Sequence, residues 1–165
     1  MTVEQKKQKN VAQGIKIFKA DHHQLRLITP LFDAYRVFYQ QPSDMHAARK
    51  FLAERLNNHE STIYFAADKQ QMTAYGFVQL YTKFSSISLS KILILNDLYV
   101  CENHRKKGIG SLLMTKTKEH AIENGFAKIV LETAPANQIA QALYLSHGYT
   151  NQEKQFINKT LDLTK

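Results

Sequence analysis

The sequence predicts an α+β domain in which a mixed sheet is flanked by helices. Short segments that alternate apolar and polar residues, as strands do, occur near the start, in the middle and near the end of the chain. Between them lie segments whose apolar residues recur every three or four positions, as in amphipathic helices. At 165 residues and 44% hydrophobic content, the chain can bury one core of its own. We expect residues 1–13 to be a flexible polar tail and residues 14–165 to be a single domain.

The first part is predicted to contain a strand and two helices. Gly14–Lys19 alternates as a strand, and Asp21 followed by Gln24 can cap a helical turn. Because proline is unfavourable inside a helix, we expect a turn and then a helix beginning at Thr29-Pro30. Ser43 is expected to be the N-cap of the second helix. The apolar residues at helical spacing are Leu31, Phe32, Tyr35, Phe38 and Tyr39, then Ala48, Phe51, Leu52 and Leu56.

The middle and end of the chain are predicted as a meander followed by alternating helices and strands. The three meander strands, expected to be antiparallel, are Thr62–Ala67, Thr73–Phe84 and Leu89–Val100. A helix at Gly108–Glu123 ends at Asn124-Gly125, and the strand Lys128–Thr133 should then pair parallel with the strand before that helix. Asn137 caps a short helix ending at Gly148. Gln155–Leu163 alternates as a closing strand.

Composition limits the classes of protein that this chain can be. The formal net charge is +8, but the basic residues do not alternate with aromatic ones, so nucleic-acid binding is disfavoured. No Cys/His spacing indicates a zinc site, and no apolar run approaches the roughly 18 residues of a membrane span. The single cysteine, Cys101, excludes an internal disulfide. We expect a protein of the cytoplasm with neither a bound metal nor a membrane partner.

The segment from Leu95 to Leu113, LNDLYVCENHRKKGIGSLL, carries the strongest functional signal. It places a basic loop and Gly108-Ile109-Gly110 at the start of a helix, whose free N–H groups and positive end favour phosphate. No Lys-Ser/Thr pair follows the second glycine, which excludes a Walker P-loop. An NAD-binding fingerprint would need glycine in place of Leu113 and no basic insert after the strand, so NAD is a minority interpretation.

Two motifs in this order resemble those of the GNAT N-acetyltransferases. Arg105 to Gly110 fits R-x-x-G-x-G, and NQIAQALYLSHGY, from Asn137 to Tyr149, is similar to NEAALALYEKLGF in that family. The resemblance covers about Gly14 to Leu163, and VQLYTKFSSISLSKILILNDLYV is most similar to the diamine (spermidine/spermine and thialysine) acetyltransferase branch. It implies the GNAT fold: a mixed, mostly antiparallel sheet of about six to seven strands, flanked by about four helices and splayed between strands four and five.

The resemblance implies an acetyl-CoA-dependent N-acetyltransferase. The acetyl group would move to a primary amine by direct attack in a ternary complex, with Tyr144 as general acid on the CoA thiolate. Asn137 either contacts the cofactor, caps its helix, or does both. The residues implied to bind acetyl-CoA are Leu98, Tyr99, Val100, Arg105, Lys106, Lys107, Gly108, Ile109, Gly110, Ser111, Asn137, Ala140 and Tyr144.

The general base is less well defined by the sequence. Many relatives carry glutamate at the position of Asn96. Asp97 is the nearest acid and our candidate base, although it points to the opposite sheet face if the strand is regular. Glu132 is a second candidate, and a chain of waters with no dedicated base is a third possibility.

The acceptor is predicted to be a small amine or an amino-acid-like compound. Tyr35, Arg36, Asn96 and Glu132 are the candidate acceptor-binding residues, with Tyr39, Gln79 and Tyr81 nearby. Arg36 stands where polyamine enzymes tend to have an acid, and it would suit an amine that bears its own carboxylate. The alternatives are a protein or histone lysine acetyltransferase and a regulator that binds acyl-CoA without turnover. Members of the family are often homodimers.

Overall fold

A five-stranded mixed sheet forms the centre of the protein in the computed structural model, which describes residues 14–70, 73–151 and 159–164. In sheet order the strands are β1 (Ile15–Lys19), β2 (Ser61–Asp68), β3 (Ala74–Ser85), β4 (Ser90–Val100) and β5 (Lys128–Val130). Neighbours from β1 to β4 are antiparallel, whereas β4 and β5 are parallel. The predicted α+β class, the meander and the parallel last pair are therefore confirmed.

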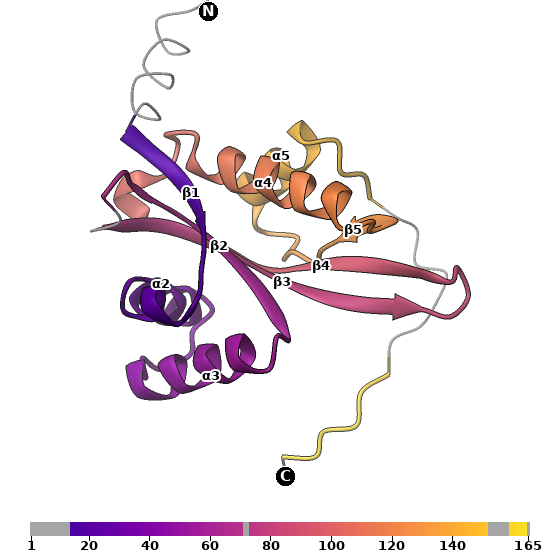
Figure 1. The fold of residues 1–165 in the computed structure, drawn as a ribbon, viewed down its shortest axis with the longest axis horizontal. Helices are drawn as coiled ribbons and strands as arrows, with labels where there is room; N and C mark the ends of the chain where they lie inside the picture. The colour runs from indigo at the N-terminus through magenta and orange to yellow at the C-terminus, as the bar shows by residue number, and fades with distance from the viewer. Residues whose placement is uncertain (1–13, 71–72, 152–158, 165) are drawn as a thin grey trace, which may run out of the picture.

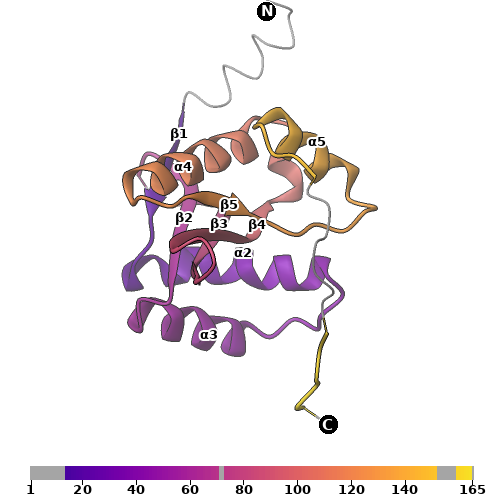
Figure 2. The same ribbon diagram turned by 90° about the vertical axis from the view of Figure 1, so that its right-hand side faces the viewer.

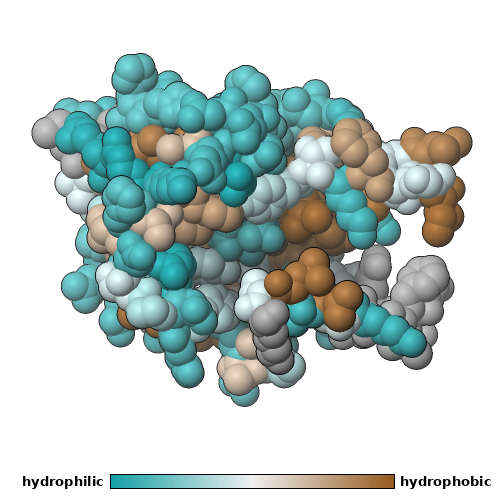
Figure 3. All heavy atoms as spheres, turned by 90° about the horizontal axis from the view of Figure 1, so that it is seen from below, coloured by the Kyte–Doolittle hydropathy of each residue, from teal (hydrophilic) through white to brown (hydrophobic). Residues whose placement is uncertain are grey.

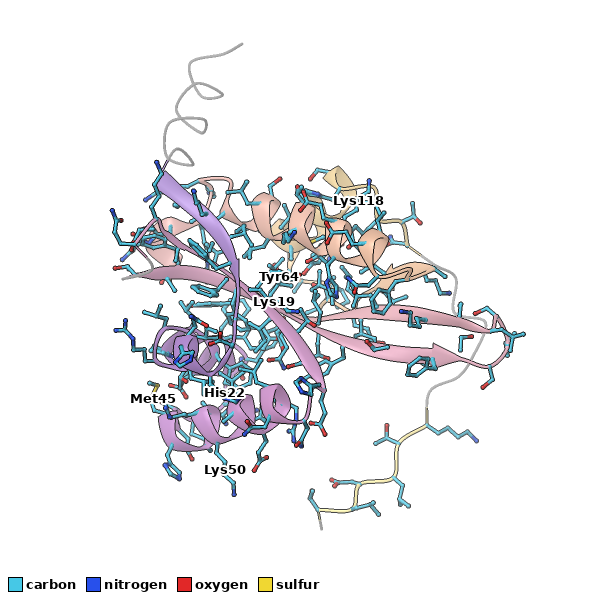
Figure 4. The ribbon with its side chains drawn as sticks, viewed as in Figure 1. Lys19, His22, Met45, Lys50, Tyr64 and Lys118 are labelled. Carbon is cyan, nitrogen blue, oxygen red and sulfur yellow. The ribbon has the colours of Figure 1, made fainter. Side chains whose placement is uncertain are left out.

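Helices cover both faces of the sheet (Figures 1 and 2). α2 (Leu25–Phe38) and α3 (Met45–Asn57) lie on one face, and α4 (Ile109–Glu123) and α5 (Gln138–Ser146) lie on the other. Figure 4 labels Met45 at the start of α3 and Lys118 on α4, on opposite sides of the sheet. Two 3₁₀ turns, η2 (His22–Gln24) and η3 (Glu102–His104), precede α2 and α4. Within the described residues, no helix is both long and apolar enough to cross a bilayer.

Two apolar cores hold these layers together. On the α2/α3 face, the core contains Ile28, Leu52, Phe65 and Phe77, all completely buried. On the α4 face, it contains Leu93, Leu95, Ile109, Leu113 and Met114. Burial of these side chains, which contributes roughly 1.5–3 kcal/mol for each large one, fixes α2 and α4 on opposite sides of β4.

The β3–β4 hairpin projects beyond the helices (Figure 1). Its end is hydrophobic, as Figure 3 shows at the right of the view. Phe84, Ile87 and Leu89 are exposed there.

Among the described residues the sheet has five strands, fewer than the six to seven predicted. Of the predicted closing strand Gln155–Leu163, residues 155–158 lie outside the described residues, and residues 159–163 are not in a strand. β5 ends at Val130 and not at Thr133, because its pairing with β4 extends only from Ile92 to Ile94. A bulge at Asn96 lies two residues beyond Ile94, and a bulge locally disrupts the ladder.

The start of α2 also differs from the prediction. The helix begins at Leu25, so Pro30 lies inside it and not at its first turn. Proline removes a hydrogen bond to the carbonyl four residues earlier, which here belongs to Arg26. Because Arg26 and Pro30 are both exposed, water can satisfy that carbonyl. The predicted Asp21–Gln24 capping box is confirmed, but it caps η2.

The N-cap of α3 is Asp44 and not Ser43 as predicted. The Asp44 carboxylate accepts a hydrogen bond from the Ala47 N–H at 2.9 Å. Ser43 is engaged elsewhere, because its hydroxyl donates to the buried carboxylate of Asp33 at 2.6 Å. The predicted Asn137 cap of α5 and the Asn124-Gly125 end of α4 are both confirmed.

Asp33 joins α2 to the α2–α3 connection. Besides the Ser43 hydroxyl, it accepts the Asp44 N–H at 2.8 Å and lies 3.5 Å from an Arg36 guanidinium nitrogen. The hydrogen bonds from Ser43 and Asp44, and then the charge of Arg36, lower the pKa of the Asp33 carboxyl despite its burial. Ionised Asp33 therefore stabilises the fold.

We predict that Asp33→Ala lowers the free energy of unfolding by about 2–3 kcal/mol, because it leaves several donors without an acceptor. Asp44→Ala, which removes only a cap, should cost about 1 kcal/mol. Urea denaturation measures both. Because Asp33 has a lowered folded pKa, its contribution is complete above the unfolded pKa of 3.8 and is lost as the pH falls through the folded value. Equal costs for the two variants at pH 7 would contradict this role.

Candidate active site

The N-terminus of α4 presents free backbone donors. The first intrahelical bond runs from the Leu112 N–H to the Gly108 carbonyl at 3.1 Å. The N–H groups of Ile109, Gly110 and Ser111 therefore have no carbonyl partner within the helix. Gly108 is the N-cap with φ +84°, a left-handed conformation that favours glycine, and it has no side chain to cap these donors. This arrangement fits a phosphate group.

The three predicted basic residues of the loop differ in their surroundings. Arg105 donates from Nε to the Val100 carbonyl at 3.0 Å, and its guanidinium lies over the rings of Phe38 and Tyr99. Lys107 donates to the Asn103 carbonyl at 2.8 Å. Lys106 is exposed. Two of these cations thus hold the loop in shape, and Arg105 also links it to α2.

α5 packs closely against the first turn of α4. A Cβ atom added to Gly110 would lie 3.1 Å from Leu143 Cδ2 on α5, which is a tight contact. A side chain at position 110 would therefore push Leu143 back by a few tenths of an ångström, so glycine allows the close packing of the two helices. Asn137 begins α5, and its Oδ1 accepts the Ala140 N–H at 3.2 Å. The prediction that Asn137 caps this helix is thus confirmed.

A bulge in β4 determines which side chains face α2. Gln79 pairs with Asp97 and Leu80 pairs with Leu95, so Asn96 is the extra residue. Before the bulge, Leu95 faces the α4 core. After it, even-numbered residues such as Leu98 face that core, whereas Tyr99 packs on the α2/α3 core. The strand is therefore not regular. In a regular strand Asp97 would lie on the same face as Leu95, but after the bulge it lies on the same face as Tyr99.

Asp97 is a buried carboxylate at the centre of a polar cluster. It is 5% exposed and accepts hydrogen bonds from Asn96 Nδ2, 3.1 Å from each carboxylate oxygen, and from the Tyr35 hydroxyl. Burial raises the pKa of Asp97, and the Asn96 and Tyr35 donors oppose that rise only in part. Burial and the neighbouring Asp97 also raise the pKa of Tyr35, which keeps this phenol protonated as a donor.

Tyr144 lies near the same cluster, on α5. Its ring centroid is 6.0 Å from that of Tyr149. Burial, with a smaller effect of Tyr39, raises the pKa of Tyr144 to about 12. Tyr144 also contributes to the raised pKa of Tyr35, so Tyr35 is within electrostatic reach of both Asp97 and Tyr144. Asp97 therefore interacts with Tyr35, and Tyr144 acts on Tyr35 more weakly through its charge.

Gln79 and Tyr81 extend the cluster along β3. Gln79 is completely buried and donates from Nε2 to the Tyr81 hydroxyl, whereas its Oε1 has no hydrogen-bond partner among the described residues. Burial, then the neighbouring Asp97, raises the pKa of Tyr81 to about 12. A shallow cavity of about 480 Å³ lies nearby, between the end of α2 and the β5–α5 connection. It is lined by Phe38, Tyr39, Gln40, Ala134, Ala136 and Asn137.

Two predicted acceptor residues have different surroundings from this cluster. The Arg36 guanidinium bonds the Pro42 carbonyl at 3.3 Å as well as Asp33, so its contacts belong to the α2–α3 connection. Glu132 is exposed in the segment after β5, in contrast to the buried Asp97. The other two, Tyr35 and Asn96, bond Asp97 directly.

Sequence reasoning missed the bulge and the second tyrosine beside Tyr144. The signal for the bulge was present, because two consecutive polar residues, Asn96 and Asp97, interrupt the alternation of β4. Tyr149 ends the S-H-G-Y segment, and its hydroxyl is buried with no hydrogen-bond partner among the described residues. Nothing in the sequence distinguishes it from an ordinary core tyrosine.

Comparison with known proteins shows the family to which the chain belongs. Residues 28–149 match the Acetyltransferase (GNAT) family. The uncharacterized N-acetyltransferase YhfO of Bacillus subtilis (strain 168) is 42% identical over 136 residues, 82% of this chain and 89% of that protein. A probable acetyltransferase of Haemophilus influenzae is 32% identical over 120 residues, 73% of this chain and 82% of its own. The crystal structure of a probable acetyltransferase superposes with a TM-score of 0.83 at 37% identity, covering 91% of this chain and 99% of the other. The chain therefore belongs to the GNAT family of acetyltransferases.

Proposed function

We propose that this acetyltransferase moves the acetyl group of acetyl-CoA to a small primary amine. One observation carries the proposal: the carboxylate of Asp97 is buried, at 5% exposed, and accepts hydrogen bonds from Asn96 Nδ2 and the Tyr35 hydroxyl. A buried carboxylate can accept a proton from an incoming amine, and a phenol such as that of Tyr144 can donate one to a leaving group. Both have pKa values raised chiefly by burial, which is common among groups at functional sites.

The backbone around α4 and β4 fits a cofactor that carries phosphates and a peptide-like arm. The N–H groups of Ile109, Gly110 and Ser111 would hold the diphosphate, with Lys106 adding positive charge. The arm would pair with the main chain of Leu98 to Val100, beyond the residues where β5 pairs with β4. When bound, acetyl-CoA supplies an acetyl thioester, the group that the amine attacks.

Asp97 is proposed to accept the proton of the amine at a carboxylate oxygen. An amine is nucleophilic only when it is neutral, so a base beside it raises the reactive fraction. The raised pKa of Asp97 makes it a stronger base than an exposed aspartate. Asn96 and Tyr35 would orient the carboxylate, because each donates a hydrogen bond to it.

Tyr144 is proposed to donate from its hydroxyl to the sulfur of the departing thiolate. With a pKa of about 12, Tyr144 stays protonated throughout the physiological range, so it acts as a donor and not as a base. Donation to the negative charge that develops on sulfur lowers the barrier to departure.

The acceptor is proposed to be a small amine with an uncharged body. The cavity of about 480 Å³ beside Tyr39 and Asn137 has the size of a small-molecule site. An amino-acid-like acceptor would need a free cation, whereas the Arg36 guanidinium already bonds Asp33 and Pro42. A diamine or polyamine, as in the branch that the sequence resembles, would favour a carboxylate at position 96, where this chain has asparagine.

We predict that acetyl-CoA, at about 100 times its dissociation constant, raises the thermal midpoint of the protein by roughly 5–10 °C, whereas NAD does not. An amine screen with thiol release as readout then defines the acceptor. It should include aliphatic monoamines, spermidine, lysine and a lysine-containing histone peptide, and we expect the monoamines to be the best substrates.

Each other outcome of these assays is informative. Stabilisation by NAD alone would overturn the proposal. Binding of acetyl-CoA without turnover of any amine would indicate a regulator. Preference for the peptide would indicate a protein lysine acetyltransferase.

We predict that Tyr144→Phe lowers kcat by about 100-fold or more, with little change in KM for acetyl-CoA, because it removes only the proton donor. Steady-state kinetics measure the effect. Tyr149→Phe is the matched control, since it removes the hydroxyl of the adjacent ring, and it should retain most of the activity. A Tyr144→Phe enzyme as active as the unmodified protein would show that Tyr144 is not the acid.

A further inference from the structure

The end of α5 is joined to the first turn of α4 by a side-chain hydrogen bond. His147 Nε2 lies 2.8 Å from Ser111 Oγ, and both side chains are partly buried. Ser111 is the third residue of α4, so its N–H is one of the three backbone donors at that helix end. His147 is the C-cap of α5. The contact therefore connects the phosphate-binding backbone to the helix that carries Tyr144.

The direction of this hydrogen bond decides what the Ser111 hydroxyl can do. If Ser111 donates its proton to His147, the hydroxyl has no donor left for a ligand. If the imidazole donates from Nε2, the Ser111 oxygen is the acceptor and its O–H is free to donate elsewhere. An anion beside the Ser111 N–H attracts that O–H, so a bound phosphate stabilises the second arrangement.

His147 is also bonded to the residue proposed as the acid. Its backbone N–H donates to the carbonyls of Leu143 at 3.2 Å and Tyr144 at 3.0 Å, and the Tyr149 N–H donates to the same Tyr144 carbonyl at 3.1 Å. His147 thus contacts the start of α4 through its imidazole and the Tyr144 turn of α5 through its backbone N–H.

We propose that His147 is a positioning residue for the cofactor. Its Nε2–H donates to Ser111 Oγ and leaves the Ser111 hydroxyl as a fourth donor, beside the three backbone N–H groups, for the diphosphate of coenzyme A. This inference rests on the proposed function, because it assumes that coenzyme A binds at the start of α4. It adds a residue outside the R-x-x-G-x-G loop to the binding of the cofactor.

The first test is a comparison of coenzyme A affinities by isothermal titration calorimetry. His147→Leu should raise Kd about five- to tenfold. It removes the imidazole N–H that orients the Ser111 hydroxyl towards the ligand, but it keeps an apolar side chain of similar size. Ser111→Ala should weaken binding to a similar extent. The double variant should bind no more weakly than either single variant, because both remove the same interaction. His147→Gln, which keeps an amide donor, should stay within about twofold of the unmodified protein.

The second test reads the tautomer of His147 directly. In long-range ¹H–¹⁵N NMR spectra of the complex with coenzyme A, Nε2 of His147 should carry a proton. His46→Leu, at an exposed position on α3, is the control for loss of a surface histidine and should leave Kd unchanged.

The outcomes separate this inference from the proposed function. If the unmodified protein does not bind coenzyme A, the proposed function fails and this inference fails with it. If that protein binds but His147→Leu has an unchanged Kd, only the role of His147 is overturned. That role is also overturned if the effects of His147→Leu and Ser111→Ala add, if His147→Gln binds as weakly as His147→Leu, or if Nε2 is unprotonated in the complex.

Discussion

The bulge at Asn96 is the constraint on which the rest of the site depends. It shifts the alternation of β4 by one residue, so Leu95 and Leu98 both face the α4 core while Asp97 bonds Tyr35 of α2. β4 loses its β5 partner just before the bulge. Asn96 thus separates the part of β4 that pairs with β5 from the part that carries Asp97. Bulges next to functional sites commonly redirect a side chain in this way.

The two halves of the site are supported from opposite faces of the sheet. Tyr35 comes from α2 and Tyr144 from α5, and the pKa of Tyr35 is raised chiefly by burial, with further effects of Asp97 and, most weakly, Tyr144. Arg105 links the phosphate-binding loop to α2, because it bonds the Val100 carbonyl and lies over Phe38. A change in the packing of α2 would therefore alter the contacts of Arg105 in the loop before α4 as well as those of Tyr35 with Asp97.

Local patterns predicted much of the fold, and long-range contacts account for most of the errors. The α4 segment and its Asn124-Gly125 end were predictable from local sequence, because glycine favours the left-handed conformation that follows a helix. Ser43 was a reasonable cap by residue type, but Asp33, ten residues earlier, takes its hydroxyl. Pro30 is tolerated because its face of α2 is exposed, which only tertiary structure reveals. In the candidate site, the motifs point to Tyr144 and the α4 backbone, whereas the surroundings of Asp97 and Arg36 depend on the bulge and on the α2–α3 connection.

The central claim is that the bulge places Asp97 in a buried position where it serves as the base. The most direct measurement is a ¹³C NMR titration of the Asp97 carboxyl carbon, in the unmodified protein and in Tyr35→Phe. We predict a pKa above the 3.8 of an ordinary aspartate, because burial outweighs the Asn96 and Tyr35 donors, and a still higher pKa in Tyr35→Phe, which loses one of them. Activity should then fall as the pH drops through that pKa, because only ionised Asp97 accepts a proton. A pKa at or below 3.8, unchanged in Tyr35→Phe, would contradict both the placement and the role.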